Sequence, residues 1–399
     1  MTREGIYNAS YKALNTSHCL LLESATGTGK SKVSIDLVNN LCSTMYKGKK
    51  VRMLLLVYRT VHKITWRDEI TKWHGLDVDV LDITCYASLH KYCNKHYDVV
   101  VADEVHHVGS ELKLNLLKQL HFDYLIGLSA TIPRKTKQYF KYKYHAECVS
   151  CDIVEAINDG ILPEPEILLF PLEVENTRLS ETIEVNAKSP GPIFQGEYKD
   201  LWKFKKTKQH AILKCTQRQK LNELNSLIDW EKKKYMQTRS PGMERSWLYH
   251  SGKRLEFLAD CKLGIVKLIL QKLKNCRTIT FCKSIAQSEE LGKWCIHSKK
   301  KDKALQYYDD FNAKKINHIT AVNILNENAN LVDCKYAIFT NFSSSETCMP
   351  QRLGRSMRHP HPVIIMPYYE GTREQEIMEK YLEGFNKDFI RTIHSIEEI

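Results

Sequence analysis

The chain has 399 residues, of which 43% are hydrophobic and 27% charged, a globular composition that excludes a fibrous or largely disordered protein. This length corresponds to two or three domains of roughly 150 residues each. Lysine and arginine exceed aspartate and glutamate by 12 charges, which is compatible with a polyanionic partner such as nucleic acid, and equally with solubility alone. No apolar stretch approaches the roughly 18 residues of a membrane span, and no apolar signal core follows the N-terminus. We therefore expect a cytoplasmic protein that has no membrane partner.

Thirteen cysteines are scattered through the chain, and their odd number indicates a reducing compartment rather than a disulfide framework. One close pair, Cys148 and Cys151, has the spacing of some metal and redox sites. A zinc site needs a second pair of ligands at a suitable spacing, and none follows in the sequence. A metal or redox role for this pair is therefore the minor alternative.

Short apolar runs alternate with amphipathic segments in the first part of the chain. The apolar runs are rich in Val, Leu and Ile, which predicts strands buried on both faces of a parallel sheet. These runs are 18–23, 52–58, 78–86, 98–103 and 124–128, and segments with helical spacing lie at 32–45 and 62–73. The alternation predicts βαβ units and an α/β domain.

The pattern changes after residue 160. A run bracketed by prolines predicts a strand at 167–170, and the polar stretch 177–196 predicts a loop or linker. Residues 199–239 read as helical and basic, with twelve Lys and Arg against four Asp and Glu. A second α/β pattern then has helices at 263–273 and 372–389 and strands at 278–282, 336–341 and 363–367. We expect a first domain (1–160), a connecting strand and linker (161–198), a basic helical insertion (199–240) and a second domain (241–399).

A Gly-rich turn joins the first predicted strand to the first predicted helix. Backbone N–H groups in such a turn, at the start of a helix, bind phosphate. Lys30 is therefore expected to reach the β- and γ-phosphates of a nucleotide, and the Ser31 hydroxyl to bind Mg²⁺. Ser24 stands where the general pattern has its first glycine, and a Gly-rich turn with an incidental lysine is the alternative. The predicted phosphate-binding loop reads Ala25-Thr26-Gly27-Thr28-Gly29-Lys30-Ser31.

Two adjacent carboxylates, Asp103 and Glu104, end the apolar run at 98–103. By itself such a pair is most often a solvated turn. Downstream of a phosphate-binding loop in the same predicted sheet, it is more specific for nucleotide hydrolysis. Asp103 is then expected to hold Mg²⁺, and Glu104 to orient and deprotonate the attacking water.

The phosphate-binding loop followed by Asp103-Glu104-Val105-His106 resembles superfamily 2 helicases and translocases of the DEAH or DExH branch. The resemblance covers most of the chain outside the basic insertion. It implies tandem RecA-like domains of the P-loop NTPase class, ATP and Mg²⁺ as cofactors, and nucleic acid as partner. Further motifs follow in the family's order. Motifs Ia, Ic and IV imply contacts with nucleic acid, at Arg59, Thr60, Thr84, Ser88 and Ser284. Motif III implies that Ser129 and Thr131 couple hydrolysis to domain movement.

The segment 351–358 matches motif VI, Gln-x-x-Gly-Arg-x-x-Arg. The resemblance implies that Gln351, Arg355 and Arg358 complete the catalytic site from the second domain. The transition state of phosphoryl transfer spreads negative charge over the γ-oxygens, which arginine side chains stabilise. The spacing of three residues predicts that Arg355 and Arg358 point to one side of a helix.

The sequence departs from the family pattern in two places. Motif V has Asn328 and Asn330 where the family usually has Gly and Asp, so Asn330 keeps a polar group for coupling but loses the charge. The nucleotide-base motif normally has a Gln shortly before the phosphate loop, and no Gln precedes Lys30 here. Tyr7 or Tyr11 is the alternative partner for adenine.

The basic segment 199–239 has two interpretations. In one, Lys232, Lys233 and Lys234 grip a phosphate backbone while aromatic side chains stack on bases. The candidate aromatics are Trp202, Phe204, Trp230 and Tyr235. In the other, the segment is a solvated hairpin with those aromatics packed inward, and the spacing of Leu221, Leu224, Leu227 and Trp230 predicts at least one packed stripe.

The combined expectation is a monomeric ATP-dependent DNA helicase or branch-remodelling translocase. The small size and the composition rich in Lys and Asn resemble phage-encoded members of the family, which implies a role in replication, recombination or repair in the host cytoplasm. An RNA helicase on the same scaffold is one alternative, because backbone contacts dominate and no motif reads the 2′-OH. A non-unwinding nucleic-acid-binding subunit of a restriction or defence complex is the other.

Overall fold

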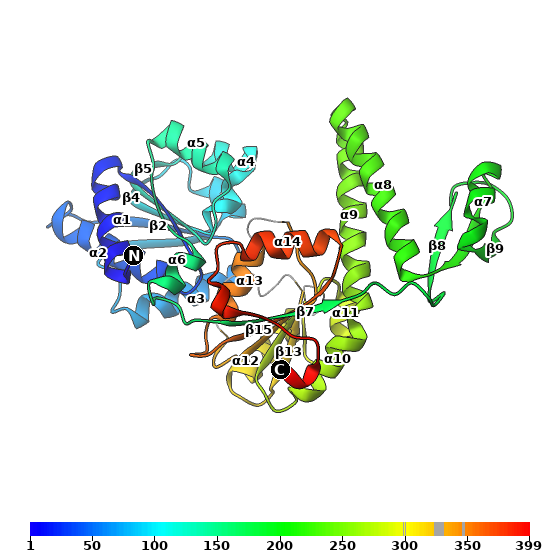
Figure 1. Ribbon diagram of the computed structural model, residues 1–399. Helices are drawn as coiled ribbons and strands as arrows, with labels where there is room; N and C mark the ends of the chain where they lie inside the picture. The colour runs from blue at the N-terminus through cyan, green and yellow to red at the C-terminus, as the bar shows by residue number, and fades with distance from the viewer. Residues whose placement is uncertain (298, 300, 323–330, 345–347) are drawn as a thin grey trace.

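The computed structural model describes residues 1–297, 299, 301–322, 331–344 and 348–399. Two parallel sheets with flanking helices form two lobes, and a long helical hairpin and a small third sheet project from the second lobe (Figure 1). The expected α/β class with two parallel-sheet domains is therefore confirmed. Within the described part of the chain, no helix combines the length and the apolar character that crossing a bilayer requires.

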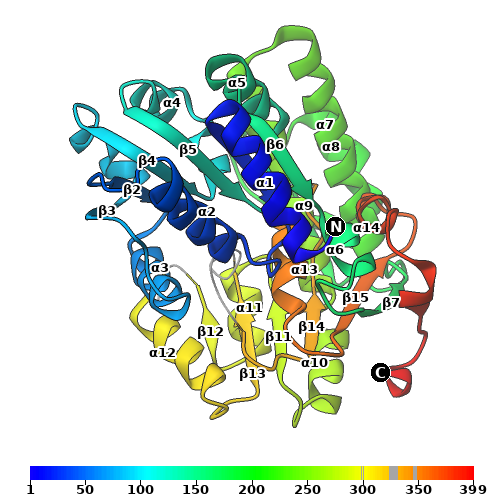
Figure 2. The same cartoon turned by 90° about the vertical axis from the view of Figure 1, so that its left-hand side faces the viewer.

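The first lobe contains a six-stranded parallel sheet in the order β3-β2-β4-β5-β1-β6. Alternate residues of each strand face opposite sides, so Leu20 and Leu22 join one core and Cys19 and Leu21 the other. Helices α1 (Arg3–Ser17), α2 (Lys30–Thr44) and α3 (Thr60–Lys72) cover one face, and α4 (Glu111–Leu117) and α5 (Arg134–Tyr144) cover the opposite face (Figure 2). The strands are β1 (Cys19–Ser24), β2 (Arg52–Val57), β3 (Val80–Cys85), β4 (His96–Asp103), β5 (His121–Ser129) and β6 (Glu147–Cys151).

The parallel arrangement brings the predicted motifs of the first lobe to one edge of the sheet. β1 ends at the phosphate-binding loop, β4 at Asp103 and β5 at Ser129. β4 pairs with β5, and β5 pairs with β1, so these three ends are neighbours. In open α/β sheets, ligands bind at the carboxyl ends of the strands.

The second lobe contains a seven-stranded parallel sheet in the order β12-β13-β11-β14-β15-β7-β16. The run predicted as a connecting strand is β7, and Ile167 pairs with Ile364 of β15, so this strand is an integral part of the second sheet. The predicted C-terminal helix ends earlier than expected, at Leu382. The strands are β7 (Glu166–Leu172), β11 (Thr278–Phe281), β12 (Cys295–Ile296), β13 (His318–Ala321), β14 (Tyr336–Phe339), β15 (Val363–Tyr369) and β16 (Ile390–Thr392), and the helices are α10 (Leu263–Lys272), α11 (Ile285–Leu291), α12 (Lys301–Asn312), α13 (Cys348–Ser356) and α14 (Arg373–Leu382).

The two lobes pack against one another. A single hydrophobic cluster contains side chains of both sheets, including Leu22 of β1 and Phe339 of β14. Helix α6 (Ile153–Asn158) and the segment that follows it connect the lobes, and Leu162 of that segment is buried in the same cluster. The structure therefore has the cleft between the lobes in a closed arrangement.

The projecting part differs from the sequence-based expectation. The stretch 177–196 was expected to be a loop, which is wrong, because it contains β8 (Glu181–Val185) and part of β9 (Phe194–Glu197). Both strands pair with β10 (Ala211–Cys215), a strand inside the segment that was expected to be helical. These short strands were not predicted because each is only four or five residues long and contributes few residues, such as Val185 and Leu213, to the small core. Helix α7 (Leu201–Thr207) packs on this small sheet.

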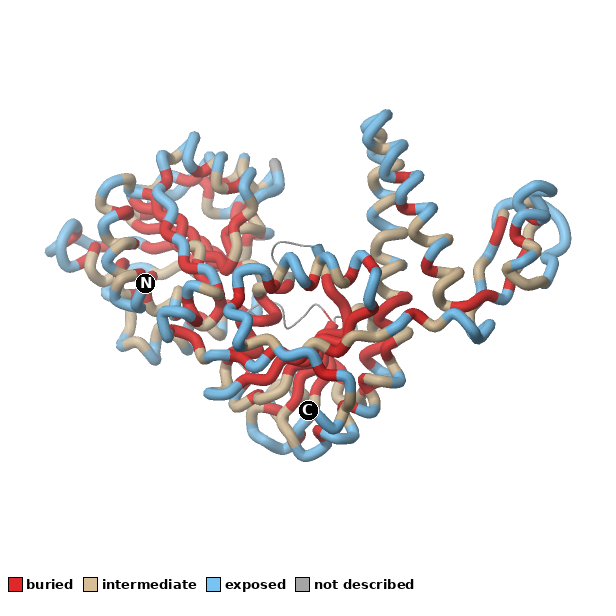
Figure 3. Tube along the Cα trace, in the orientation of Figure 1, coloured by how far each residue is buried: buried red, intermediate tan, exposed pale blue. Residues whose placement is uncertain are grey.

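The helical hairpin consists of α8 (Gln217–Thr238) and α9 (Pro241–Cys261). It continues past residue 240, where the insertion was expected to end. Its base is held by a small core that contains Leu221, Phe257 and Leu258. Toward the tip, exposed residues become more frequent (Figure 3). The hairpin is therefore anchored to the second lobe and solvated at its outer end.

Candidate active site

The turn after β1 has the backbone of a phosphate-binding loop. Gly27 and Gly29 have φ angles of 99° and 100°, in the left-handed region that favours glycine. The Ser24 and Thr28 hydroxyl oxygens lie 2.6 Å apart, and the Thr28 hydroxyl donates to the Ala25 carbonyl at 2.8 Å. The serine at the position of the usual first glycine is thus buried inside the loop, where it bonds to a second hydroxyl.

Lys30, the first residue of α2, folds its side chain back into this loop. Its Nζ donates to the carbonyl oxygens of Ser24 at 2.6 Å and Ala25 at 3.1 Å. Burial lowers the pKa of Lys30 to about 8, although the negative charges of Glu104 and Asp103 act in the opposite direction. The lysine, the loop and both carboxylates therefore form one electrostatic unit.

Asp103 and Glu104 lie in the closed cleft at the end of β4, with exposed fractions of 6% and 5%. The indole Nε1 of Trp66 donates to Oδ2 of Asp103 at 2.8 Å, and the Tyr86 hydroxyl donates to the Asp103 carbonyl at 2.8 Å. Mg²⁺ is commonly held by one or two protein oxygens and the phosphates of a nucleotide. A carboxylate that is buried but firmly hydrogen-bonded, beside a lysine and the half-buried Ser31, fits that ion.

His106 connects Glu104 to the motif III segment. Its Nδ1 lies 3.3 Å from Oε2 of Glu104 and 2.8 Å from the Ser129 hydroxyl, which in turn donates to the Thr131 carbonyl at 2.8 Å. Burial raises the pKa of Glu104, but the close contact with His106 and the positive charge of Lys30 outweigh this effect and lower the pKa below its ordinary value. Glu104 is therefore an ionised acceptor in this site.

Helix α13 brings the second lobe onto the phosphate-binding loop. A Cβ atom added to Gly354 would lie 2.7 Å from Cβ of Thr26, so only glycine permits this approach. A Cβ atom added to Gly27 would lie 3.7 Å from Cζ of Arg358, which places that guanidinium beside the loop. Arg355 is in the last turn of α13 and its charge acts on both Lys30 and Glu104.

Two side-chain nitrogen atoms of this second lobe are buried without an acceptor among the described residues. These atoms are Nε2 of Gln351 and Nε of Arg358. Burial lowers the pKa of Arg358. Buried donors without acceptors are costly, so a site of this kind favours an anionic ligand that supplies the acceptors.

The residues predicted to contact nucleic acid are distributed unevenly. Arg59 and Thr60 are exposed at the N-terminal end of α3, and the Thr60 hydroxyl lies 3.9 Å from Sγ of Cys85, so motifs Ia and Ic are neighbours. Ser88 is half-buried, whereas Thr84 is only 2% exposed and its side chain is covered in this conformation. Ser284 caps α11 by accepting a hydrogen bond from the Gln287 N–H at 3.0 Å. Asn328 and Asn330, the altered positions of motif V, lie outside the described residues.

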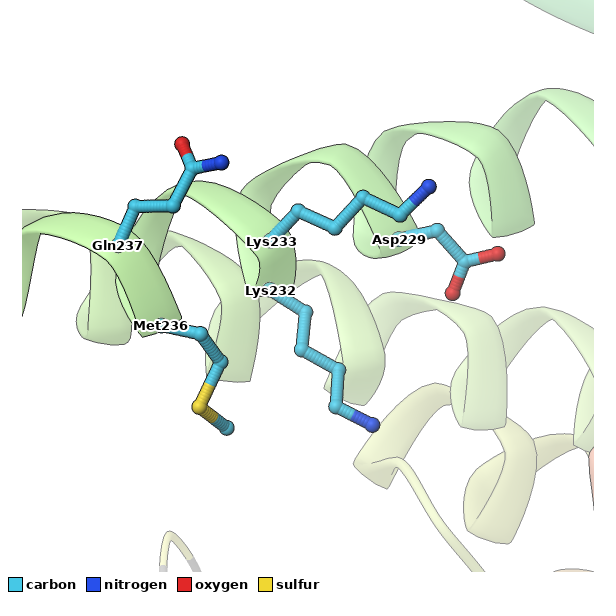
Figure 4. A pocket seen from close by; sticks show the side chains of 5 residues that line it. All are labelled: Asp229, Lys232, Lys233, Met236 and Gln237. Atoms are coloured by element: carbon cyan, nitrogen blue, oxygen red, sulfur yellow. The ribbon is translucent and has the colours of Figure 1, made fainter.

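Some residues of the basic segment 199–239 are exposed, as nucleic-acid binding requires, and others are packed inward, as in a solvated hairpin. Lys232 and Lys233 extend from the solvated side of α8 beside Asp229, Met236 and Gln237 (Figure 4), and Lys234 is also exposed. Trp202 is 68% and Trp230 53% exposed, as stacking on bases requires. By contrast Phe204 of α7 is buried against the small third sheet, and Tyr235 stacks on Trp247 with ring centroids 5.8 Å apart. The leucine stripe is packed at Leu221 but 37% exposed at Leu227.

Three residues of the site escaped the sequence analysis. Trp66 carries no motif and its role depends on a contact across the sheet edge, so no sequence signal predicted it. His106 and Gly354 lie inside quoted motifs, and their contacts explain why those positions are occupied by histidine and glycine.

Tyr7 and Tyr11, the candidate partners for adenine, stack on one another, with ring centroids 6.3 Å apart. Around Cys148 and Cys151, as elsewhere in the described chain, no group of three or more His, Cys, Asp or Glu residues is arranged to hold a metal ion.

Comparisons with known proteins find similarity to helicases. Residues 261–360 match the helicase conserved C-terminal domain. The chain is 26% identical over 164 residues to the probable helicase D10 of Escherichia phage T5, a match that covers 36% of this chain and only 34% of that protein. Among solved structures, the Hef helicase domain of Pyrococcus furiosus is 14% identical with a TM-score of 0.50, covering 95% of this chain and 97% of that one. A variant of S. cerevisiae Dbp5, bound to RNA and ADP BeF3, is 11% identical with a TM-score of 0.59, covering 99% of this chain and 91% of that one. At these identities, the two structural similarities support the fold.

Proposed function

We propose that the chain is a superfamily 2 helicase of the DExD/H type, which uses ATP hydrolysis to unwind or remodel branched DNA; the match to the helicase C-terminal domain and to a phage helicase supports this. The observation that carries this proposal is the closed cleft. Groups from both lobes converge there on one phosphate-binding loop. The proposed setting is phage replication, recombination or repair, for which the match to the phage T5 helicase is the support.

Lys30 is the residue that holds the β- and γ-phosphates of ATP. Its ammonium group now bonds to loop carbonyls, and a nucleotide would replace those weak acceptors by charged phosphate oxygens. Glu104 accepts the proton of the attacking water and orients that water, while His106 holds the carboxylate in place. Arg355 and Arg358 stabilise the charge that develops on the γ-phosphate, and Gln351 supplies a further donor.

Asp103 and Ser31 are the residues that would hold Mg²⁺ in this site. When bound, the ion would neutralise part of the negative charge of the nucleotide phosphates. The protein's own part is to hold the Asp103 carboxylate in a fixed orientation, which the Trp66 hydrogen bond supports. Ser31 follows Lys30 at the start of α2, so the loop and the helix present both side chains to the same phosphates.

Hydrolysis can drive movement because the catalytic set is shared between lobes. The arginines reach the phosphate loop only when α13 packs on it, at the contact between Gly354 and Thr26. Release of phosphate removes the charge that holds the arginines, and the lobes are then free to separate. The Ser129–His106 contact links the state of Glu104 to the motif III segment, which supports a coupling role for Ser129 and Thr131.

Two substitutions test the catalytic assignment. Lys30→Ala removes the phosphate-binding charge, and Glu104→Gln keeps the shape of the side chain while removing its basicity. Each is expected to lower DNA-stimulated ATP hydrolysis by roughly 10²-fold or more. Lys141→Ala, on the exposed side of α5, is the matched control and is expected to keep wild-type activity. Unchanged hydrolysis in both site variants would show that the site is wrongly assigned.

An RNA helicase is the second candidate, because Dbp5, which is similar in fold, is bound to RNA in its structure. ATP hydrolysis measured with single-stranded DNA, duplex, forked DNA and RNA distinguishes the two. Stimulation by RNA alone would select the RNA enzyme. Stimulated hydrolysis without displacement of an annealed strand would instead indicate a non-unwinding subunit of a larger complex.

A further inference from the structure

Helix α3 makes a direct contact with the proposed metal site that none of the recognised motifs includes. Trp66 lies in the middle of this helix, is only 3% exposed, and belongs to the core between α3 and the first sheet. Its indole Nε1 donates a 2.8 Å hydrogen bond to Oδ2 of Asp103. An indole group has a single donor, so this bond uses the whole hydrogen-bonding capacity of the side chain.

This bond orients a carboxylate whose position decides metal binding. A hydrogen bond to an ionised oxygen is shorter and stronger than a neutral one. The rigid ring of Trp66 is packed in the core, so Oδ2 is held relative to the backbone of α3 as well as to β4. Groups that orient a metal-binding carboxylate commonly matter nearly as much as the ligand itself.

The same helix carries the proposed nucleic-acid contacts at its N-terminal end. Thr60 is the first residue of α3, and Arg59 immediately precedes it; both side chains are exposed. Trp66 is six residues farther along, a rise of about 9 Å at 1.5 Å per residue. An α-helix is stiff over that length, so a shift of its N-terminal end is transmitted to the indole.

We infer that Trp66 is a positioning residue, which fixes the Asp103 carboxylate for Mg²⁺ and makes it move together with the nucleic-acid end of α3. This inference rests on the proposed function, in which Asp103 holds the metal and Arg59 and Thr60 contact the strand. Binding of a strand at the end of α3 then improves metal binding through the indole bond. The tryptophan acts on the reaction only through Asp103.

The test is a Mg²⁺ titration monitored by binding of a fluorescent ADP analogue, so that no turnover is needed. Trp66→Phe keeps an aromatic ring and removes the donor, and it is expected to raise the Mg²⁺ concentration at half-saturation by about tenfold. Replacing Trp66 with benzothienylalanine, which has sulfur in place of N–H, should give the same shift without a change in packing. At saturating Mg²⁺, stimulation of ATP hydrolysis by DNA should fall to less than half of its wild-type value in both variants.

Trp73→Phe is the matched control, because Trp73 makes the same kind of bond from the C-terminal end of α3, to Oε2 of Glu69 at 2.8 Å. It should leave both the Mg²⁺ midpoint and the stimulation unchanged. Wild-type midpoints in both Trp66 variants overturn the positioning role, and wild-type stimulation overturns the coupling. Asp103→Asn distinguishes failure of this inference from failure of the proposed function. If Asp103→Asn also leaves the Mg²⁺ midpoint unchanged, Asp103 does not hold the metal and the proposed function has failed at that point. If Asp103→Asn raises the midpoint while the Trp66 variants do not, only the role of Trp66 is refuted.

Discussion

The protonation state of Lys30 should make nucleotide binding depend on pH in a specific way. Burial lowers the pKa of this lysine from 10.5 to about 8. Because the folded state then binds fewer protons than the unfolded state between these two values, the free energy of unfolding rises with pH across that window. The phosphates of a bound nucleotide favour the ammonium form, so they return the pKa toward its ordinary value and binding takes up a proton.

The magnitude follows from the fraction of charged lysine. With a pKa of about 8, about nine-tenths of the Lys30 side chains are charged at pH 7 and about one-tenth at pH 9, so the Kd for ADP should rise about tenfold over this interval. Titration calorimetry in buffers of different ionisation enthalpy should detect uptake of close to one proton at pH 9 and little at pH 7.

The matched control is Lys30→Arg, because a guanidinium stays charged over the whole range. Its Kd is expected to be weaker than that of the wild type, since arginine cannot fold into the loop in the same way, but nearly independent of pH. Any titration of the nucleotide itself affects both proteins equally and cancels in the comparison. A wild-type Kd that does not change between pH 7 and 9, or an equal pH dependence in the arginine variant, would refute the lowered pKa of Lys30.

Three further predictions concern the contact between the lobes, the helical hairpin and the buried ion pair of the second lobe. Gly354→Ala should lower kcat strongly, because the added Cβ would lie 2.7 Å from Cβ of Thr26, while each lobe keeps its unfolding midpoint. Unimpaired turnover would mean that hydrolysis does not need this contact between the lobes. Reversing the lysines at 232–234 to glutamate should weaken DNA binding and lower the slope of log affinity against log salt by about 2. An unchanged slope would favour the solvated hairpin. Lys262 and Glu374 form a fully buried ion pair, so Lys262→Met should lower the free energy of unfolding of the second lobe, measured with urea, by about 3–5 kcal/mol. Adding Glu374→Met should recover most of that free energy. If the two substitutions instead lower the stability additively, the pairing is contradicted.

Local patterns were sufficient for the parts of this protein that depend on neighbouring residues. Strands such as β4 are continuous apolar runs because both of their faces are buried, and this signal is present in the sequence itself. The loop around Lys30 and the pair at Asp103 are equally local, since a strand, a turn and a helix start are enough to define each. Their meeting at one sheet edge then follows from the parallel topology alone.

The short strands of the projecting module were not predictable in the same way. β8 and β9 are stable only because β10, which lies farther along the chain, pairs with both of them. Their own residues are mostly polar, and prolines lie between them. Pairing across such a separation leaves no periodic signal within either segment, so the stretch reads as a loop.

The sequence by itself determined the class of fold and the identity of the catalytic candidates, because these depend on residue type and short-range spacing. Only the tertiary structure decided how the candidates act on one another. The approach of Gly354 to Thr26, the bond from Trp66 to Asp103 and the lowered pKa of Lys30 all arise where elements distant in the chain exclude water from a common cleft. Burial and electrostatics at such a contact depend on every wall of the cleft, and no single segment contains that information.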